Sequence, residues 1–160
     1  MDTIFNCFLS TVCPIALYKT IGKKIFRYNE SAGITSLDPA FSRNIENIWA
    51  CNQLYNGLVQ MDDKLNIEPC LANRWELSED GMTYTFYLKN NVFFHDHKLF
   101  ENAKGRKVTA SDFVYSFNRI IDSKVASPGA WVFNNLAFDE QHNYSPFEAE
   151  NDTTLKIHLT

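Results

Sequence analysis

The sequence predicts a mixed α/β (α+β) fold, a mixed sheet with hairpins and two main helices, and three patterns indicate it. Residues 82–88 alternate apolar and polar side chains directly after a Glu-Asp-Gly turn, which is typical of the second strand of a hairpin. Residues 44–54 and 109–121 carry apolar side chains at helical spacing. Residues 153–159 alternate again and predict a strand close to the last residue.

Before the hairpin, the sequence predicts a strand, a turn and a helix. Residues 24–30 contain β-forming side chains between glycine-containing segments, which predicts a first strand. In Leu37-Asp38-Pro39 the proline fixes its own φ and favours extended geometry at Asp38, which predicts a turn. Asn44 can cap a helix over residues 44–54 that ends by Gly57. The apolar residues near helical spacing in this helix are Ile45, Ile48, Trp49 and Leu54.

Two hairpins are predicted next. Residues 58–61 and 65–67 form short strands around an Asp62-Asp63-Lys64 turn. Asp80 and Gly81 tolerate the backbone conformation of a tight turn, so the segment before them is expected to pair with strand 82–88 in a hairpin. Trp75 and Leu77 belong to this partner strand.

The second helix is predicted to begin after Thr109. The Thr109 hydroxyl can accept a hydrogen bond from the backbone of Asp112, whose carboxylate favours the positive end of a helix. Residues 127–150 are predicted to be irregular, and the strand at 153–159 then needs a partner strand. The apolar face of the helix comprises Phe113, Phe117, Ile120 and Ile121.

Composition narrows the classes of function. The 160 residues suffice for one domain with a buried core, and an aromatic content of 14% excludes a disordered chain. The net charge is −4 and charges of both signs are mixed along the chain, so no nucleic-acid partner is expected. No apolar run approaches the length of a membrane span. The composition is that of a soluble globular domain.

Six short motifs follow one another in a characteristic order. They are Leu37-Asp38-Pro39, Tyr55-Asn56-Gly57-Leu58, the segment from Pro69 to Glu76, the segment from Asp80 to Lys89, Phe94-His95-Asp96 and the segment from Val108 to Ser116. Together they resemble the extracellular solute-binding proteins, family 5, of ABC importers that carry oligopeptides, dipeptides and sometimes nickel. The resemblance runs from about Phe26 to Thr160.

The resemblance implies an incomplete lobe of the class II periplasmic-binding-protein type. Residues 25–160 would form the start of lobe I plus much of an inserted extra domain of a protein several times longer, while residues 1–24 form an atypical N-terminal segment. The implied function is that of the substrate-binding component of an importer, without enzymatic activity or a cofactor. It would capture a peptide or related small solute between two lobes and deliver it to the permease subunits. The alternative is a freestanding protein-interaction domain derived from one lobe.

The family is exported, which implies a periplasmic or cell-envelope location. Membrane association would then occur only through the permease or a lipid anchor. Residues 4–18 are apolar enough for the core of a signal peptide, but no Lys or Arg precedes Lys19 and the residues before Cys13 match a lipoprotein signal poorly.

The resemblance also indicates residues that contact the ligand. In peptide-binding members the residues just after Leu-Asp-Pro line the cleft, and here these are Ser42, Arg43, Asn44 and Ile45. A free backbone segment beside the cleft could pair with a peptide as an added strand, and Arg43 could bind a carboxylate. A solvent-facing start of a helix explains the same residues equally well.

A second ligand-contacting region follows from the Ser-Pro at 127–128. In peptide binders of this family an aromatic residue can follow this Ser-Pro and cover the ligand, but here Gly129 occupies that position. Trp131 is the nearest aromatic residue and is the candidate for this role. For Trp131 a place in the core is favoured over this role.

Other reactive residue types do not form a convincing site. His95 and His97 share one face of an extended segment, but a zinc site needs further ligands, so a structural turn around Asp96 is favoured over a metal site. An enzyme using these histidines is a remote alternative. Cys7, Cys13, Cys51 and Cys70 lack metal-ligand spacing, and buried free thiols are favoured over a disulfide.

Overall fold

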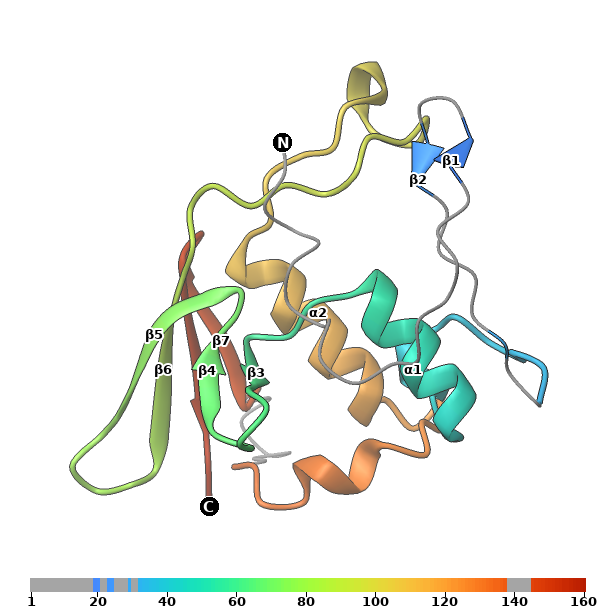
Figure 1. Cartoon of the computed structure of the whole chain (residues 1–160). Helices are drawn as coiled ribbons and strands as arrows, with labels where there is room; N and C mark the ends of the chain where they lie inside the picture. Colours follow the sequence, from blue (N-terminus) through green and yellow to red (C-terminus); the bar gives the residue numbers. More distant parts are fainter. Residues whose placement is uncertain (1–18, 21–22, 25–28, 30–31, 138–144) are drawn as a thin grey trace. The chain divides into compact units, whose positions relative to one another are not determined.

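The computed structural model describes the chain apart from residues 1–18, 21–22, 25–28, 30–31 and 138–144 (Figure 1). The chain divides into two compact units, Met1–Gly33 and Ile34–Thr160. In the described part of the first unit, β1 (Lys19–Thr20) pairs antiparallel with β2 (Lys23–Lys24). Most of the predicted first strand at 24–30 lies outside the described residues.

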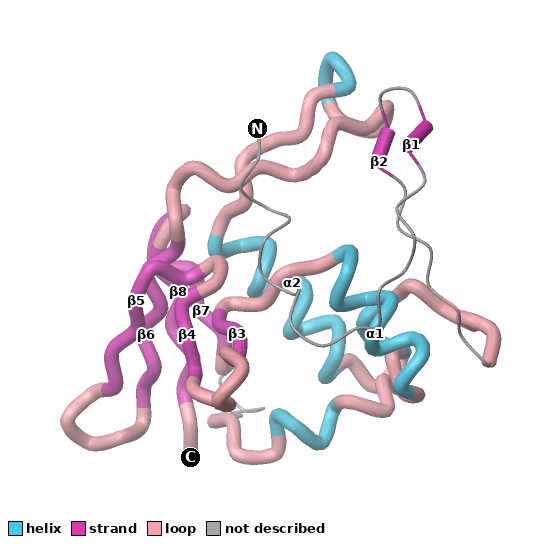
Figure 2. Tube along the Cα trace, viewed as in Figure 1, coloured by secondary structure: helices cyan, strands magenta, loops and turns pink. Residues whose placement is uncertain are grey.

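The second unit is built on a four-stranded antiparallel sheet with the order β5-β6-β8-β7 (Figure 2). Its outer hairpin is the predicted one, because Trp75 lies opposite Phe86 and Gly81 in the turn has a φ of +74°. The predicted last strand is also confirmed, and it pairs with β6 on one side and β7 on the other. The strands are β5 (Ala72–Leu77), β6 (Thr83–Leu88), β7 (Phe147–Asn151) and β8 (Thr154–His158).

Strand β7 corrects the prediction that residues 127–150 are irregular. Phe147 is 2% exposed and Ala149 is half-buried, whereas the glutamates at 148 and 150 are exposed. Buried and exposed side chains therefore alternate along β7, as in other strands. The pattern extends over only a few residues, and the segment lacks the β-branched side chains that are typical of strands. The same segment also contains a 3-10 helix, η3 (Ala130–Phe133).

A smaller antiparallel hairpin precedes the sheet. It pairs β3 (Val59–Met61) with β4 (Ile67–Pro69), so the second strand begins two residues later than predicted. The turn is longer because the Asp62 carboxylate accepts hydrogen bonds from the backbone N–H groups of both Lys64 and Asn66, each at 2.8 Å. Within this turn Leu65 adopts a φ of +64°.

Helix α2 (Ala110–Ile121) covers the sheet, as its predicted apolar face requires. The Asp112 carboxylate accepts a hydrogen bond from the Thr109 backbone N–H at 2.8 Å, and the two residues form the predicted capping box. Phe117 packs against Phe147 with ring centroids 5.2 Å apart. The buried residues of the core cluster are Leu58, Ala72, Leu88, Ala110, Phe113 and Leu155.

Helix α1 (Ile45–Leu54) confirms the predicted helix, including its end at Leu54. Asn44 occupies the N-cap position as predicted, but its side chain makes no capping hydrogen bond. The Asn47 side chain is buried instead, and its amide exchanges hydrogen bonds with the backbone N–H and the hydroxyl of Thr35 at 3.0 and 2.9 Å.

The apolar face predicted for α1 is exposed. Asn47 and Cys51 are the buried residues of this helix, because they face the rest of the unit. The exposed fractions of its apolar residues are 60% for Ile45, 41% for Ile48, 48% for Trp49 and 54% for Leu54. Positions 45, 48 and 49 are three and four residues apart and lie on one side of the helix, where another surface can pack against their exposed apolar side chains.

This exposure leads to a prediction for Ile48→Lys. We expect the free energy of unfolding to change by no more than about 0.5 kcal/mol, because the side chain already meets solvent. We also expect less self-association in light scattering, because a charge then interrupts the apolar surface. Gln53→Lys adds the same charge at an exposed polar position of the helix and is expected to change association less. A large loss of stability in Ile48→Lys would show that the face is packed.

Candidate ligand-binding site

The Leu-Asp-Pro motif forms the start of a 3-10 helix, η1 (Pro39–Phe41). The Asp38 carboxylate accepts a hydrogen bond from the Ala40 backbone N–H at 3.0 Å. Arg119, near the end of α2, also donates to both oxygens of Asp38, at 2.7 and 2.5 Å. These hydrogen bonds from Arg119, opposed by burial and assisted by the Ala40 N–H, lower the pKa of Asp38. Asp38 thus fixes η1 to α2.

The Ser-Pro-Gly loop is fixed to the same short helix. The Ser127 hydroxyl is buried and donates to the Ala40 carbonyl oxygen at 2.6 Å. Its oxygen accepts the Gly129 backbone N–H at 3.2 Å. The structure therefore joins the loop that precedes Trp131 to the segment that precedes Ser42.

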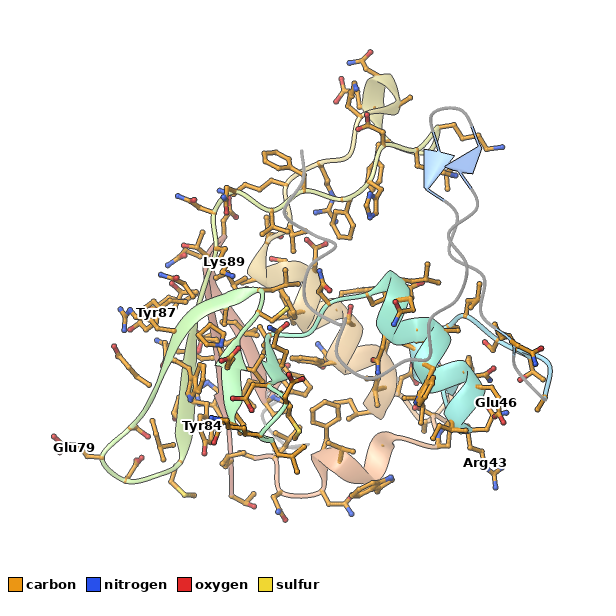
Figure 3. All side chains as sticks on the ribbon, in the orientation of Figure 1. Arg43, Glu46, Glu79, Tyr84, Tyr87 and Lys89 are labelled. Atoms are coloured by element: carbon orange, nitrogen blue, oxygen red, sulfur yellow. The ribbon has the colours of Figure 1, made fainter. Side chains whose placement is uncertain are left out.

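Residues 42–44 connect η1 to α1 in an extended conformation. Ser42 has φ −71° and ψ 91°, and Asn44 has φ −101° and ψ 160°. Arg43 and Asn44 are exposed, and Figure 3 shows Arg43 and Glu46 pointing outward at the start of α1. The Ser42 hydroxyl oxygen is buried yet has no hydrogen-bond partner within the described part of the chain.

Trp131 lies on η3 and is 70% exposed, so the favoured prediction that places it in the core is wrong. The core position of this short helix belongs to Phe133, whose ring centroid lies 5.5 Å from that of Phe117 and 5.3 Å from that of Phe147. Phe133 anchors η3, and Trp131 is left on the surface.

The segment around the two histidines is structural. Asp96 accepts the Gly105 backbone N–H at 2.9 Å and the Lys104 ammonium at 2.7 Å, which closes a loop containing the 3-10 helix η2 (Glu101–Ala103). His97 Nδ1 accepts the backbone N–H of Leu99 at 3.3 Å. Among the described residues, no group of three or more His, Cys, Asp or Glu side chains is placed to hold a metal ion.

The cysteines that the structure describes are free thiols. Cys51 is buried and Cys70 is half-buried, in agreement with the prediction for these two residues. Cys7 and Cys13 lie outside the described residues.

Sequence reasoning identified the segments of this site but not the contacts that join them. No sequence motif predicts the hydrogen bonds between Arg119 and Asp38, because the two residues are 81 positions apart. The hydrogen bond from Ser127 to Ala40 spans 87 positions. A covarying pair in an alignment is the kind of signal that could reveal such contacts.

Comparison with known proteins identifies the family. Residues 66–160 match the family model described as bacterial extracellular solute-binding proteins, family 5, middle part. The chain belongs to this family. Family 5 proteins bind substrates for ABC transporters rather than acting as enzymes, and the resemblance inferred from the six motifs is confirmed.

Individual family 5 relatives match this chain over a small part of their own length. The periplasmic murein peptide-binding protein MppA of Escherichia coli is 40% identical over 60% of this chain and 16% of its own. Heme-binding protein A of Haemophilus influenzae is 45% identical over 67% of this chain and 20% of its own. The structure of DppA from Helicobacter pylori in complex with the peptide STSA has a TM-score of 0.63 at 31% identity, covering 79% of this chain and 25% of that one.

The structural matches to H. pylori DppA and to peptide-bound OppA of Listeria monocytogenes (TM-score 0.70, 24% identity, covering 82% of this chain and 26% of that one) confirm the predicted fold class, a mixed α/β arrangement that corresponds to part of a class II solute-binding protein. MppA is named as periplasmic. Within the described residues of this chain, no helix has the length and apolarity needed to cross a membrane.

Proposed function

We propose that this family 5 chain is part of the substrate-binding component of an ABC importer for oligopeptides or related small solutes. The observation that carries the proposal is the extended segment at 42–44, in which Arg43 and Asn44 are exposed and which is connected through η1 to Asp38 and Ser127. In this proposal the ligand contacts come from Ser42, Arg43, Asn44, Ile45 and Trp131.

The chemistry of the segment suits a peptide. An extended, exposed backbone can add a second extended chain through main-chain hydrogen bonds, which gives affinity with little dependence on side chains. Arg43 is exposed and supplies a guanidinium for a carboxylate. The Ser42 hydroxyl oxygen is buried, so the contact proposed for Ser42 is made through its backbone, and an exposed Trp131 offers an apolar surface.

The names of two relatives favour a peptide ligand. MppA is named for murein peptides, and the H. pylori structure contains a tetrapeptide. Heme-binding protein A shows that a family 5 protein can be named for a different solute. Peptide is therefore the first ligand to test.

In the proposed mechanism, residues 25–160 form the start of lobe I plus an inserted extra domain. A complete binding protein closes a second lobe over the ligand, and the closed form docks on the permease subunits at the outer face of the membrane. Because closure contributes contacts from both lobes, affinity depends on both. An envelope location, with any membrane association through the permease or a lipid anchor, belongs to the same proposal.

A titration of the isotope-labelled 160-residue chain with a tripeptide tests the contact residues. We expect the amide signals of residues 42–45 and the Trp131 indole signal to move with millimolar affinity, since one lobe supplies only part of the contacts. A tripeptide amidated at its C-terminus should bind less well, and Arg43→Gln should abolish that difference.

Lys98→Gln removes a positive charge at an exposed position outside the proposed site and serves as the control. Signal changes confined to other residues would contradict the proposed site. Micromolar binding by this chain alone would contradict the requirement for a second lobe.

The alternative of a freestanding interaction domain is favoured by one observation, the exposed apolar face of α1. The size and location of the native protein distinguish the two functions. A cell-envelope protein far larger than 18.5 kDa supports the importer, whereas an 18.5 kDa cytosolic protein supports the interaction domain.

A further inference from the structure

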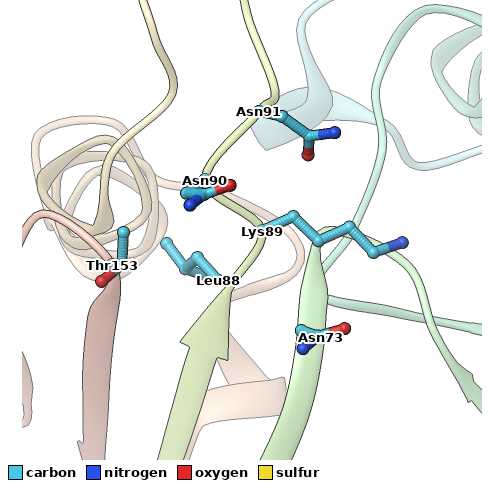
Figure 4. Close-up of a pocket in the computed structure, with 6 residues that line it drawn as sticks. All are labelled: Asn73, Leu88, Lys89, Asn90, Asn91 and Thr153. Atoms are coloured by element: carbon cyan, nitrogen blue, oxygen red, sulfur yellow. The ribbon is translucent and has the colours of Figure 1, made fainter.

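A polar hollow lies at one end of the four-stranded sheet, where β5 begins and β6 ends (Figure 4). Its volume of about 490 Å³ falls within the range of small-molecule sites, about 300–1,000 Å³. None of its lining residues belongs to the candidate peptide site. The lining residues are Asn73, Leu88, Lys89, Asn90, Asn91 and Thr153.

One of these residues occupies a β-bulge. The pairing of β5 with β6 passes from Ala72 opposite Leu88 to Arg74 opposite Tyr87, so Asn73 has no residue opposite it. A bulge of this kind redirects a side chain out of the regular alternation of a strand. Figure 4 shows the Lys89 side chain extending between Asn73 and Asn91.

The polar side chains of the hollow have unused hydrogen-bonding capacity. The side chains of its three asparagines and of Lys89 have no hydrogen-bond or ion-pair partner within the described part of the chain. The Thr153 hydroxyl donates to the Asn151 side-chain oxygen at 3.1 Å and can still accept. The lining contains one cation and no acidic side chain.

We propose that this hollow binds a small hydroxylated carboxylate of the sugar-acid type. The Lys89 ammonium donates to the carboxylate in a charge-assisted hydrogen bond. A carboxamide both donates and accepts, so the three asparagines match neighbouring hydroxyl groups, each of which also does both. The polar lining favours this hydrophilic anion over an apolar ligand. Because the lining is largely exposed, the affinity is in the millimolar range.

The test is a titration of the isotope-labelled chain with galacturonate and, in parallel, with the neutral sugar galactose. We expect saturable shifts of the backbone and side-chain amide signals of Asn73, Asn90 and Asn91 with galacturonate. Galactose should bind roughly fivefold more weakly, since it lacks the charge that meets Lys89. Lys89→Met should remove the preference for galacturonate.

Lys98→Met makes the same change at an exposed lysine outside the hollow and should keep the preference. The proposal is overturned by the absence of saturable shifts at the three asparagines, or by an unchanged preference in Lys89→Met. Either result leaves the peptide proposal unaffected, because the two sites share no residue.

Discussion

Replacing Gly105 by alanine is expected to lower the free energy of unfolding by about 2–3 kcal/mol. A Cβ atom at this position would lie 1.7 Å from the carbonyl oxygen of Phe94, which belongs to the backbone and cannot rotate away. The two chain segments therefore have to separate. Denaturant unfolding followed by tryptophan fluorescence measures the loss.

The separation would disrupt several contacts at once. The Phe94 backbone N–H donates to the Arg106 carbonyl at 2.9 Å, and the Gly105 N–H donates to Asp96. The Arg106 guanidinium also stacks over the Phe94 ring, 4.8 Å from its centroid. The Phe-His-Asp motif thus has a structural role. Gly105 allows its own backbone to approach Phe94 closely, and Asp96 of the motif accepts a hydrogen bond from the Gly105 N–H.

Gly33→Ala provides the control, because no atom of the residues that the structure describes lies within 4 Å of a Cβ added there. We expect its free energy of unfolding to stay within about 0.5 kcal/mol of the wild-type value. Equal stabilities of the two variants would show that the segments around Gly105 are not packed as the structure describes.

The parts of the fold that were predictable from the sequence have local signals. The hairpin at Trp75–Lys89 combines alternation with an Asp-Gly turn, and α2 combines an apolar face with a capping box between Thr109 and Asp112. In each case the residues that specify the structure lie within a few positions of one another.

The parts that were missed depend on distant residues. Strand β7 has a weak pattern of its own and is specified by its pairing with β8 and by burial of Phe147 under α2 and η3. For α1 the helical spacing was visible, but the buried side was decided by the hydrogen bonds of Asn47 to Thr35. Propensity cannot reveal which face of a short helix the tertiary structure covers.

The conformation of the candidate site also depends on residues that are distant in the sequence. The family resemblance located the segment Ser42–Ile45 and Trp131, but it gave no reason for their backbone conformation. That reason is the pair of long-range contacts of Asp38 with Arg119 and of Ser127 with Ala40. Both contacts are made by the chain itself, so the segments can be arranged before a ligand binds, which lowers the entropic cost of binding.

Asp38→Ala is therefore expected to affect both stability and the shape of the site. It removes the cap of η1, and the free energy of unfolding should fall by about 1–2 kcal/mol. The bond to Arg119 adds less than a buried pair would, because both side chains are about one-third exposed and solvent screens them. Hydrogen exchange should become faster in residues 40–44, and signals of the loop at 126–129 should shift through Ala40.

The pH dependence of stability tests the role of the Asp38 charge. Its pKa is lower in the folded chain than the value of about 3.9 in an unfolded chain, so its ionised form stabilises the protein. This contribution is fully present above the unfolded pKa and is lost as the pH falls through the folded pKa. The stability difference between wild type and Asp38→Asn should therefore be constant near neutral pH and shrink below about pH 4. A difference for Asp38→Asn that persists in acid would mean that the charge of Asp38 does not hold η1 in place.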